Sequence, residues 1–510
     1  MKAFDSAHSR LRLVTAAAIV FSVALMILLT AVPVANNNLW TLMKVGEIIV
    51  DTGRIPETLL FPFTTVRDNH FNAHEWLASV FFHELDRMVG LRNLMWVVSL
   101  FAVAQFALCV ALAKRRSASL GAALLLALLA MICANARYVL RPEMIALLLL
   151  VLLLLVLHRY QAQRRWPVLA WTLILEVVWA NCHGSFLLGP AIVGIFALGE
   201  GLTASRAASG TLALRLRQGW SAGWPYAVTM LAMIAVCVAN PGGWKLLAFP
   251  FQLQDSKVMR ELIGEWLPTF SPRFMIERAF LIFALVGLAA VLLMARLRRF
   301  LGATDALLFL FFAALALDRS RHIVWFGFIA MTVCARLLGH VEISPRRELQ
   351  LRCAAAAFAA AGLFADMRLG NAVGARISYS PSDNFSAAMV TELASPTMTG
   401  NVMNSYELGS ELIYRDWPRL KPSIDTRVDS YGVDYLLFSI RLLQDEKLLN
   451  LFLEANRVEH MLLLKRDFEL GVRRMPSIRA NWHVQLTDGD IFLLDRNVPL
   501  PSAAASRAAP

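Results

Sequence analysis

The feature that most constrains this chain is a series of long apolar runs separated by short polar connections. A helix that crosses a bilayer needs ~20 mostly apolar residues, and a soluble domain has no use for so many runs of that length. Only 17% of the 510 residues are charged and 58% are hydrophobic, which is also typical of membrane proteins. The sequence therefore predicts a polytopic α-helical membrane protein with about eleven spans. They lie near 12–33, 92–113, 118–136, 143–158, 167–181, 185–203, 224–240, 278–295, 303–317, 322–339 and 353–366.

Basic residues gather in every second connection, for example at 114–116, 164–165, 296–299 and 346–347. Loops rich in Lys and Arg stay in the cytoplasm, so the N-terminus is predicted to be cytoplasmic and the segment after about 366 external. The chain has a bacterial appearance, which predicts a multi-pass protein of the inner (plasma) membrane with a periplasmic C-terminal domain. The net charge of +12 comes from these clusters, so it indicates topology and not a nucleic-acid partner.

The six cysteines lie in or beside apolar runs, and none has the spacing of zinc ligands. We interpret them as small apolar core residues. The sequence also contains no phosphate-binding P-loop and no dinucleotide motif. It therefore predicts no cofactor and no metal site, while a requirement for a divalent metal ion stays open.

Six polar segments interrupt the apolar pattern, and all six fall on the predicted external face. They read ANNNLW, RPEM, ANCHGS, NPGGW, GEWLP and LDRSRH. Unrelated polar loops would be distributed over both faces of the membrane. We therefore expect these segments to form one site.

Asn181 and His183 stand where two apolar runs meet, and Glu176 lies inside the first of these runs. An ionisable residue at membrane depth is usually buried against protein and is often functional. On a continuing helix, Glu176, Trp179 and His183 would share one face. The structural alternative is a Glu176 that is protonated or paired for packing, with a His183 that only caps the helix.

Arg141 stands before the Pro and Glu that begin a predicted span. Pro and Glu suit the first turn of a helix, whereas an arginine at the membrane surface can hold a phosphate with two hydrogen bonds. Arg319, Arg321 and His322 form a second polar group before another span. The alternative for these arginines is extension toward lipid headgroups.

The first external loop, residues 33–91, is too long for a simple connector. Apolar residues at helical spacing predict two amphipathic helices that lie on the membrane surface, the first capped by Asn38 and the second beginning at Asn72. Glu75, three residues after Asn72, either closes a capping box or serves the site. The two roles are compatible.

From about 376 the composition becomes more polar, and strand-like segments flank a helical stretch at 432–456. This predicts a small external α/β domain over 376–497, after a transmembrane domain over 1–366. Asp425, Arg427 and Asp429 alternate as on a strand, which would form a surface ladder or a ligand-facing edge. Residues 498–510 have a disordered composition.

Taken in order, these motifs resemble a group of bacterial multi-pass membrane proteins related to GT-C glycosyltransferases. The matching segments are 36–77, 141–143, 179–189, 240–243, 265–268, 319–322, 404–414 and 424–432. The resemblance implies a GT-C-like fold and transfer of a sugar from a polyprenyl-phosphate donor to an acceptor on the external face. GT-C enzymes typically use a carboxylate in the first external loop. This chain has Asn36, Asn37 and Asn38 where related proteins carry an Asp.

The leading hypothesis is therefore a membrane glycosyltransferase that acts on a cell-surface glycan, lipid or protein. Glu75 is the predicted general base, with Glu176 in reserve, because a base must accept the proton of the acceptor hydroxyl. Cations must offset the charge of the leaving phosphate. The predicted substrate-binding residues are Asn38, Arg141, Asn181, His183, Glu265, Arg319, Arg321 and His322.

Two other classes stay open. The Asn triplet favours a catalytically inactive scaffold or glycan-assembly component with the same fold. A transporter or flippase would typically show an internal repeat and paired interrupted helices, and the sequence shows no obvious repeat. The expected partners are a lipid-linked sugar donor, membrane lipids, and a glycan or protein acceptor.

Overall fold

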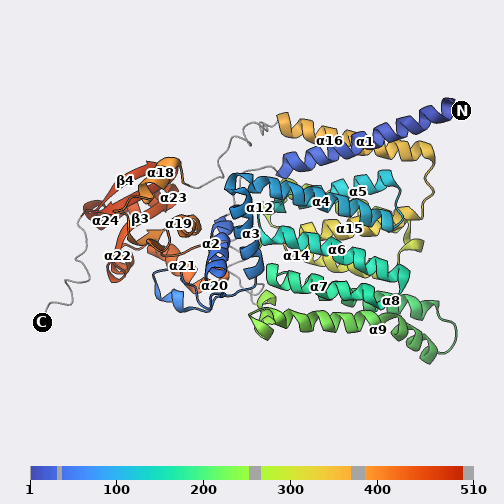
Figure 1. Ribbon diagram of the computed structural model, residues 1–510, viewed down its shortest axis with the longest axis horizontal. Helices are drawn as coiled ribbons and strands as arrows, with labels where there is room; N and C mark the ends of the chain where they lie inside the picture. Colours follow the sequence, from blue (N-terminus) through green and yellow to red (C-terminus); the bar gives the residue numbers. More distant parts are fainter. Residues whose placement is uncertain (1, 31–36, 252–265, 369–384, 498–510) are drawn as a thin grey trace. The chain divides into compact units, whose positions relative to one another are not determined.

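The computed structural model describes residues 2–30, 37–251, 266–368 and 385–497 (Figure 1). The chain divides into two compact units. The first, which we call the helical unit, contains Met1–Pro33 and Leu91–Tyr379. The second, the loop–tail unit, contains Val34–Gly90 and Ser380–Pro510. The predicted disordered segment 498–510 lies outside the described residues.

Each of the eleven predicted spans is a helix in the helical unit. The helices are α1 (Lys2–Thr30), α4 (Leu94–Arg115), α5 (Leu120–Ala134), α6 (Pro142–Gln163), α7 (Trp166–Cys182), α8 (Leu188–Ala207), α9 (Leu212–Val236), α13 (Arg278–Arg296), α14 (Ala303–Asp318), α15 (Ile323–Gly339) and α16 (Pro345–Arg368). Within the described residues, eight helices are long and apolar enough to cross a membrane, and α5 and α7 are shorter apolar helices. The predicted polytopic α-helical fold is confirmed.

Two helices begin well before the apolar core that predicted them. Helix α9 starts at Leu212 and α16 at Pro345, where the sequence predicted starts near 224 and 353. The polar residues of these first turns resembled loops, but helices extend past the apolar part of a span. Thr211 caps α9, because its hydroxyl accepts a hydrogen bond from the Leu214 amide at 3.4 Å.

Glycines allow the closest helix contacts of this unit. A Cβ on Gly219 would lie 2.9 Å from the Gly201 carbonyl oxygen, and one on Gly223 would lie 2.6 Å from that of Ala197. Both contacts join α8 to α9, which lie side by side in Figure 1. Small residues let membrane helices approach in this way because backbone then meets backbone.

The spans differ widely in how much protein surrounds them. In α15 and α6, 78% and 67% of the span residues are buried, against 11% in α13 and in α16. Helices α6 and α15 therefore form the centre of the helical unit, while α13 and α16 leave most of their apolar surface for lipid. Polar residues that must avoid lipid are best placed on α6 and α15.

One end of the helical unit holds a buried ionic network, which we call the Asp305 network. Asp305, 2% exposed, pairs with Arg116 at 2.5 Å and with Arg336 at 3.0 Å. Arg116 also lies 3.2 Å from Nδ1 of His158. Asp305 lies in the first turn of α14 and Asp318 in its last turn, so the two helix ends are separated by ~20 Å. The other members of the network are Gln161, Arg164, Glu200 and Thr304.

The loop–tail unit contains a five-stranded mixed sheet in the order β2-β1-β3-β5-β4. Its strands are β1 (Gly400–Asn404), β2 (Leu420–Pro422), β3 (Val458–Leu464), β4 (Trp482–Asp488) and β5 (Ile491–Arg496). Strands β2, β1 and β3 are parallel, and β5 runs antiparallel to β3 and β4. The helices are α18 (Ala387–Leu393), α19 (Gly409–Asp416), α20 (Val428–Tyr431), α21 (Val433–Leu442), α22 (Glu446–Ala455), α23 (Lys465–Leu470) and α24 (Pro476–Asn481).

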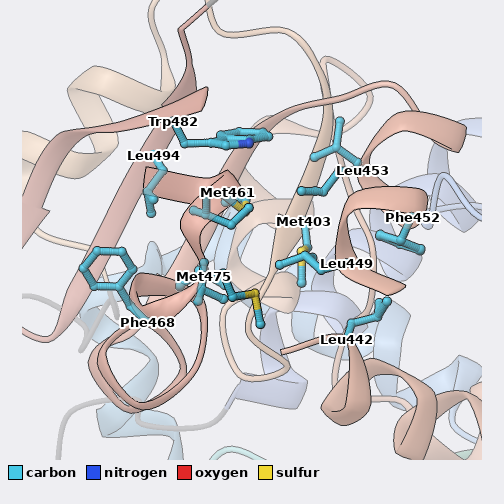
Figure 2. Close-up of a cluster of buried hydrophobic side chains, with 14 residues drawn as sticks. Met403, Leu442, Leu449, Phe452, Leu453, Met461, Phe468, Met475, Trp482 and Leu494 are labelled. Carbon is cyan, nitrogen blue, oxygen red and sulfur yellow. The ribbon is translucent and has the colours of Figure 1, made fainter. Parts of the chain in front are cut away.

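The main core of this unit lies between the sheet and α21–α22. Figure 2 shows Met403, Met461 and Met475 in the middle of the core, with Phe468 toward one side, Phe452 toward the other and Trp482 at the top. Strand β3 is buried along almost its whole length, because it lies inside the sheet and two buried apolar clusters cover its two faces. The predicted C-terminal α/β domain is confirmed.

The first loop contributes α2 (Asn37–Thr52) and α3 (Trp76–Val89) to this unit. The sequence predicted that their apolar faces lie on the membrane. For α2 this prediction is wrong, because the helix packs against α3 and α19, and Trp40 and Met43 are fully buried. For α3, where Met88 and Val89 are exposed, it stays a prediction. A Cβ on Gly46 would overlap the backbone of Ser79, so α2 and α3 touch directly. The apolar face of α2 is covered by protein.

Three local predictions in this unit were wrong. Helix α2 begins at Asn37, so Asn38 lies in its first turn and is not its cap. Helix α3 begins at Trp76 with Glu75 as its N-cap residue, so Asn72 and Glu75 do not form a capping box. The Asp425–Arg427 segment is not a strand but a turn that leads into α20. Gly53 and Gly90 do end α2 and α3, each with a positive φ.

Candidate functional site

Several predicted site residues lie at the end of the helical unit opposite the Asp305 network. This end carries residues 135–143, 179–189, 237–248 and 318–325. We call it the motif end, because most of the polar motifs that the sequence singled out lie there. The residues below are described by the connection that positions them.

The α14–α15 connection places two arginines in protein surroundings. Arg319 follows the last residue of α14 and is only 4% exposed. Its Nε lies 3.5 Å from the Asp318 carboxylate and makes no hydrogen bond among the described residues. The guanidinium of Arg321 lies over the Trp266 ring at 4.3 Å. Arg319 is thus held inside the protein and does not extend toward lipid.

The segment after residue 265 supports this connection. The Ser320 amide donates to the Leu267 carbonyl oxygen at 3.1 Å, and the Thr269 hydroxyl donates to that of Ala316 at 2.5 Å. His322 ends the connection, and its Nδ1 lies 3.1 Å from the Leu315 carbonyl oxygen. Hydrogen bonds from two directions therefore fix the backbone that carries Arg319 and Arg321. Glu265 itself lies outside the described residues.

The α5–α6 connection adds a charged pair to the same end. Arg137 Nη1 lies 3.5 Å from Oε2 of Glu143, and both side chains are almost fully buried. Glu143 belongs to the first turn of α6. Arg141 is half-buried and precedes Pro142 at the start of α6, as the sequence predicted.

At the end of α7, Asn181 fixes a turn. Its Oδ1 accepts a hydrogen bond from Nδ2 of Asn240 at 3.1 Å, and Asn240 Nδ2 also donates to the Ala180 carbonyl oxygen at 3.0 Å. The Gly242 amide in turn donates to Oδ1 of Asn240 at 2.8 Å. Asn181 therefore joins the end of α7 to the turn after α9. Its amide oxygen has a structural role in this arrangement.

His183 is the first residue after α7. Ser185 determines which of its two ring nitrogens carries the hydrogen. The Ser185 amide donates to His183 Nδ1 at 3.2 Å, and the Ser185 hydroxyl lies 2.7 Å from the same nitrogen. A backbone amide can only donate, so Nδ1 is an acceptor, and the Ser185 hydroxyl, which accepts from Nε1 of Trp179 at 3.0 Å, donates to His183. Because Nδ1 is an acceptor, the neutral ring carries its hydrogen on Nε2. Trp179 also stacks on Trp325 of α15 at 6.0 Å, which brings α7 against α15.

Glu176 contacts two residues of the motif end, Gly189 and Cys237, but lies deep among α7, α8 and the end of α9. It is 0% exposed, and its Oε1 accepts from the thiol of Cys237 at 3.3 Å. A Cβ on Gly189 would overlap Oε2, so the glycine makes room for the carboxyl group. The side chain faces α8 and Cys237, whereas His183 has left the helix. The expected common face of Glu176 and His183 is not formed.

Two predicted site residues belong to the loop–tail unit. The Glu75 side chain is 26% exposed, and its carboxylate lies 3.7 Å from Nε2 of His74. Asn38 is exposed in the first turn of α2. Among the described residues, no group of three or more His, Cys, Asp or Glu side chains could hold a metal ion.

Sequence reasoning missed four residues of the motif end. Asn240 contacts Asn181 and Trp266 contacts Arg321, while Arg137 and Glu143 form an ion pair at the same end. The signal for Glu143 was present in the RPEM motif, but its place at a helix N-terminus explained it without a site. Its burial beside an arginine becomes evident only in three dimensions.

Comparison with known proteins defines the class of fold. No family model and no curated protein matches the sequence. Solved structures do match, and they define a polytopic membrane fold of the GT-C glycosyltransferase type with a C-terminal α/β domain. The predicted GT-C-like fold is therefore confirmed.

Among the matching structures are several of an oligosaccharyltransferase from Archaeoglobus fulgidus. Its apo form matches with a TM-score of 0.55 and 13% identity, over 89% of this chain and 70% of that chain. The archaeal oligosaccharyltransferase AglB from Archaeoglobus fulgidus, in complex with an inhibitory peptide and a dolichol-phosphate, matches with a TM-score of 0.54 and 14% identity, over 96% of this chain and 75% of that chain. The Zn and sulfate complex of the oligosaccharyltransferase seen in the apo form matches with a TM-score of 0.54 and 14% identity, over 89% and 68%. At this identity the likeness establishes the fold.

Proposed function

We propose that this protein is a membrane glycosyltransferase that transfers a sugar from a polyprenyl-phosphate donor to a glycan, lipid or protein acceptor at the external membrane face. The observation that carries the proposal is the gathering of charged and polar side chains at the motif end, with a buried arginine, Arg319, among them. The fold is shared with an enzyme whose structure contains a dolichol-phosphate, which supports a lipid-phosphate ligand.

The charge balance of the motif end suits an anionic ligand. Its four segments carry four arginines and Lys245 against two carboxylates, Asp318 and Glu143, a formal excess of three positive charges. A guanidinium binds phosphate oxygens in pairs and is pre-organised when its plane is held. Trp266 holds the plane of Arg321, and the neutral ring of His183 carries its hydrogen on Nε2. These groups would stabilise the phosphate that leaves the sugar.

The general base is proposed on chemistry and sequence. A base must come within hydrogen-bond reach of the acceptor hydroxyl. Glu176 is fully enclosed, so an acceptor cannot reach it without opening the helix packing. Glu75 is partly exposed and lies in the loop where GT-C enzymes typically carry a carboxylate. We therefore assign the base to Glu75. Asn38, in the same loop, remains a proposed contact to the substrate.

The orientation follows from the positive connections. An N-terminus in the cytoplasm places the motif end outside, where a polyprenyl-phosphate sugar is used. For a bacterial chain this membrane is the inner membrane, and the loop–tail unit lies in the periplasm. A reporter that is active only in the periplasm is fused after residue 497, and it is expected to be active.

Ligand binding tests the proposal most directly. Polyprenyl phosphate without a sugar is titrated into purified protein in nanodiscs, and binding is followed by native mass spectrometry. Arg319→Gln is expected to weaken binding at least ~tenfold, because a charge-assisted hydrogen bond inside protein is lost. Arg298→Gln, at an exposed position of a predicted cytoplasmic connection, serves as the matched control. Equal affinity of both variants would refute a phosphate site at Arg319.

A second candidate function is favoured by the three asparagines at 36–38. A neutral amide cannot act as a base, so the chain would then be a non-catalytic scaffold that binds the lipid phosphate. A thin-layer assay with radiolabelled polyprenyl-phosphate sugars separates the two. Transfer that is lost in Glu75→Gln supports the enzyme, whereas binding without transfer supports the scaffold.

A further inference from the structure

A hairpin-like segment of the first loop leads directly to Glu75. Thr58 and His70 form an isolated antiparallel bridge, and the Phe71 amide donates to the Glu57 carbonyl oxygen at 2.8 Å. The Leu59 amide donates to the carbonyl oxygen of Asn69 at 3.2 Å. The segment 57–71 therefore has two arms, and the second arm ends four residues before Glu75.

One arginine of the tail is held in a fixed orientation. Arg427 donates from Nε and Nη2 to the two oxygens of Asp425, at 2.9 and 2.6 Å. Asp425 is 0% exposed, and it also accepts from the hydroxyl of Tyr431 at 2.7 Å. Burial raises the pKa of Tyr431 well above its usual value, so this hydroxyl stays protonated and remains a donor. The guanidinium plane is thus set by a buried carboxylate.

This guanidinium contacts both arms of the first-loop segment. It lies 4.8 Å from the ring centre of Phe61 and 5.7 Å from that of Phe71. A guanidinium held near two aromatic rings gains cation–π energy from each. Phe61 lies on the first arm and Phe71 on the second, so a single side chain connects the arms to each other and to the tail.

Other contacts of the segment reach the tail at its tip. The Phe63 amide donates to the Pro422 carbonyl oxygen at 3.2 Å, and the Thr64 hydroxyl lies 3.1 Å from that of Tyr435. Tyr435 in turn donates to the Ser423 carbonyl oxygen at 2.9 Å. These contacts hold the tip, whereas Arg427 holds the end that continues to Glu75.

We propose that Arg427 is a positioning residue for Glu75: it grips both arms of segment 57–71 and so fixes where the start of α3 and its carboxylate lie within the loop–tail unit. Between Phe71 and Glu75 the chain is short, and the Trp76 amide returns to the Ala73 carbonyl oxygen at 3.3 Å. A displacement of Phe71 is therefore transmitted to Glu75 through only a few residues. The effect of Arg427 on catalysis rests on the proposed function of Glu75, whereas its contacts with the two arms do not.

Hydrogen exchange on the full-length protein in nanodiscs tests the grip. In Asp425→Asn/Arg427→Gln, which removes the ion pair without leaving a buried charge, the amides of Leu59 and Phe71 are expected to exchange at least ~tenfold faster. Phe71→Leu, which keeps apolar volume but removes the ring, is expected to act in the same direction. The controls are Arg466→Gln, whose side chain pairs with Glu407 within the tail, and Phe63→Leu, whose ring packs on Phe452.

Unchanged exchange at Leu59 and Phe71 in both test variants overturns the inference. Phe71→Leu keeps the test decisive if the double variant fails to fold. Faster exchange that is confined to α22 would also contradict it, because the effect would then lie in the core of the tail.

A kinetic measurement separates positioning from mere stability. Arg427→Lys keeps the cation but loses the paired hydrogen bonds. It is expected to transfer sugar at a rate between those of the wild type and of Asp425→Asn/Arg427→Gln. The turnover number should fall while KM for the lipid donor stays unchanged. A rise in KM alone refutes positioning of the base. If the wild type transfers no sugar, the proposed function fails, and the exchange experiment still decides the grip.

Discussion

Replacing Asp305 by Asn is a sharp test of how the helical unit is held together. The carboxylate is 2% exposed and contacts two guanidinium groups, Arg116 at 2.5 Å and Arg336 at 3.0 Å. The amide is nearly the same size as the carboxylate, so the change removes charge and leaves packing intact. Any loss of stability then reports the charge.

The magnitude follows from burial. The Arg116 side chain is 8% exposed, and removing one partner of such a buried pair costs ~3–5 kcal/mol because the other charge is left uncompensated. The Arg336 side chain is 35% exposed, so its pair contributes under ~1 kcal/mol. The asparagine oxygen can still accept from Arg116. We therefore expect a loss near the lower limit, ~3 kcal/mol in the free energy of unfolding.

A double-mutant cycle with Arg116→Met isolates the pair. The assay is reversible unfolding in mixed detergent micelles, followed by tryptophan fluorescence. Because Met fills a similar volume without a charge, the double variant should recover most of the stability that Asp305→Asn loses. Additive losses, or a single variant as stable as the wild type, would refute the reasoning. Affinity for polyprenyl phosphate should not change, since α14 separates the network from the motif end.

Three further predictions follow from individual contacts. Gly189→Ala should destabilise the protein by ~1–3 kcal/mol, because the Cβ of the alanine would overlap the Glu176 carboxyl group. Adding Glu176→Ala should restore much of this stability in a thermal unfolding assay. A loss that is not restored would contradict the contact. Trp266→Ala should weaken binding of polyprenyl phosphate by ~0.5–2 kcal/mol, because Arg321 loses the ring that orients it; unchanged affinity in native mass spectrometry would exclude this role. Hydrogen bonds from Ser477 lower the pKa of Glu446 below its usual 4.5. They therefore stabilise the fold above that pH and are lost as the pH falls through the lowered pKa. Below it, the Ser477 amide should exchange its hydrogen faster, whereas in Glu446→Gln its exchange protection should not depend on this titration.

The sequence was sufficient to predict what depends on neighbouring residues. Apolar runs of spanning length predicted all eleven helices, since each run must be buried in lipid or protein whatever its partners are. Strand-like segments around β3 and β5 were also evident, because their residues are β-formers between polar turns. The connection at Arg319–His322 was singled out correctly as a polar group between two spans.

What the sequence did not reveal depends on residues far apart in the chain. Nothing near Asn181 indicates that its partner is Asn240, and nothing near Trp40 indicates that Tyr414 will cover it. The alternating charges of Asp425 and Arg427 imitated a strand, although they form an ion pair across a turn. The Asn72–Glu75 spacing imitated a capping box, although two turn residues precede the helix.

The union of the first loop with the tail has a consequence for biosynthesis. Thr64 and Tyr435, which contact each other, are 371 residues apart in the chain. At translation rates of ~5–20 residues per second, the loop emerges roughly 20–70 seconds before its partner exists. During that interval Trp40 and Met43, which end fully buried, have only α3 to cover them. Truncation before residue 400 should therefore leave these side chains exposed and the protein a substrate for quality-control proteases.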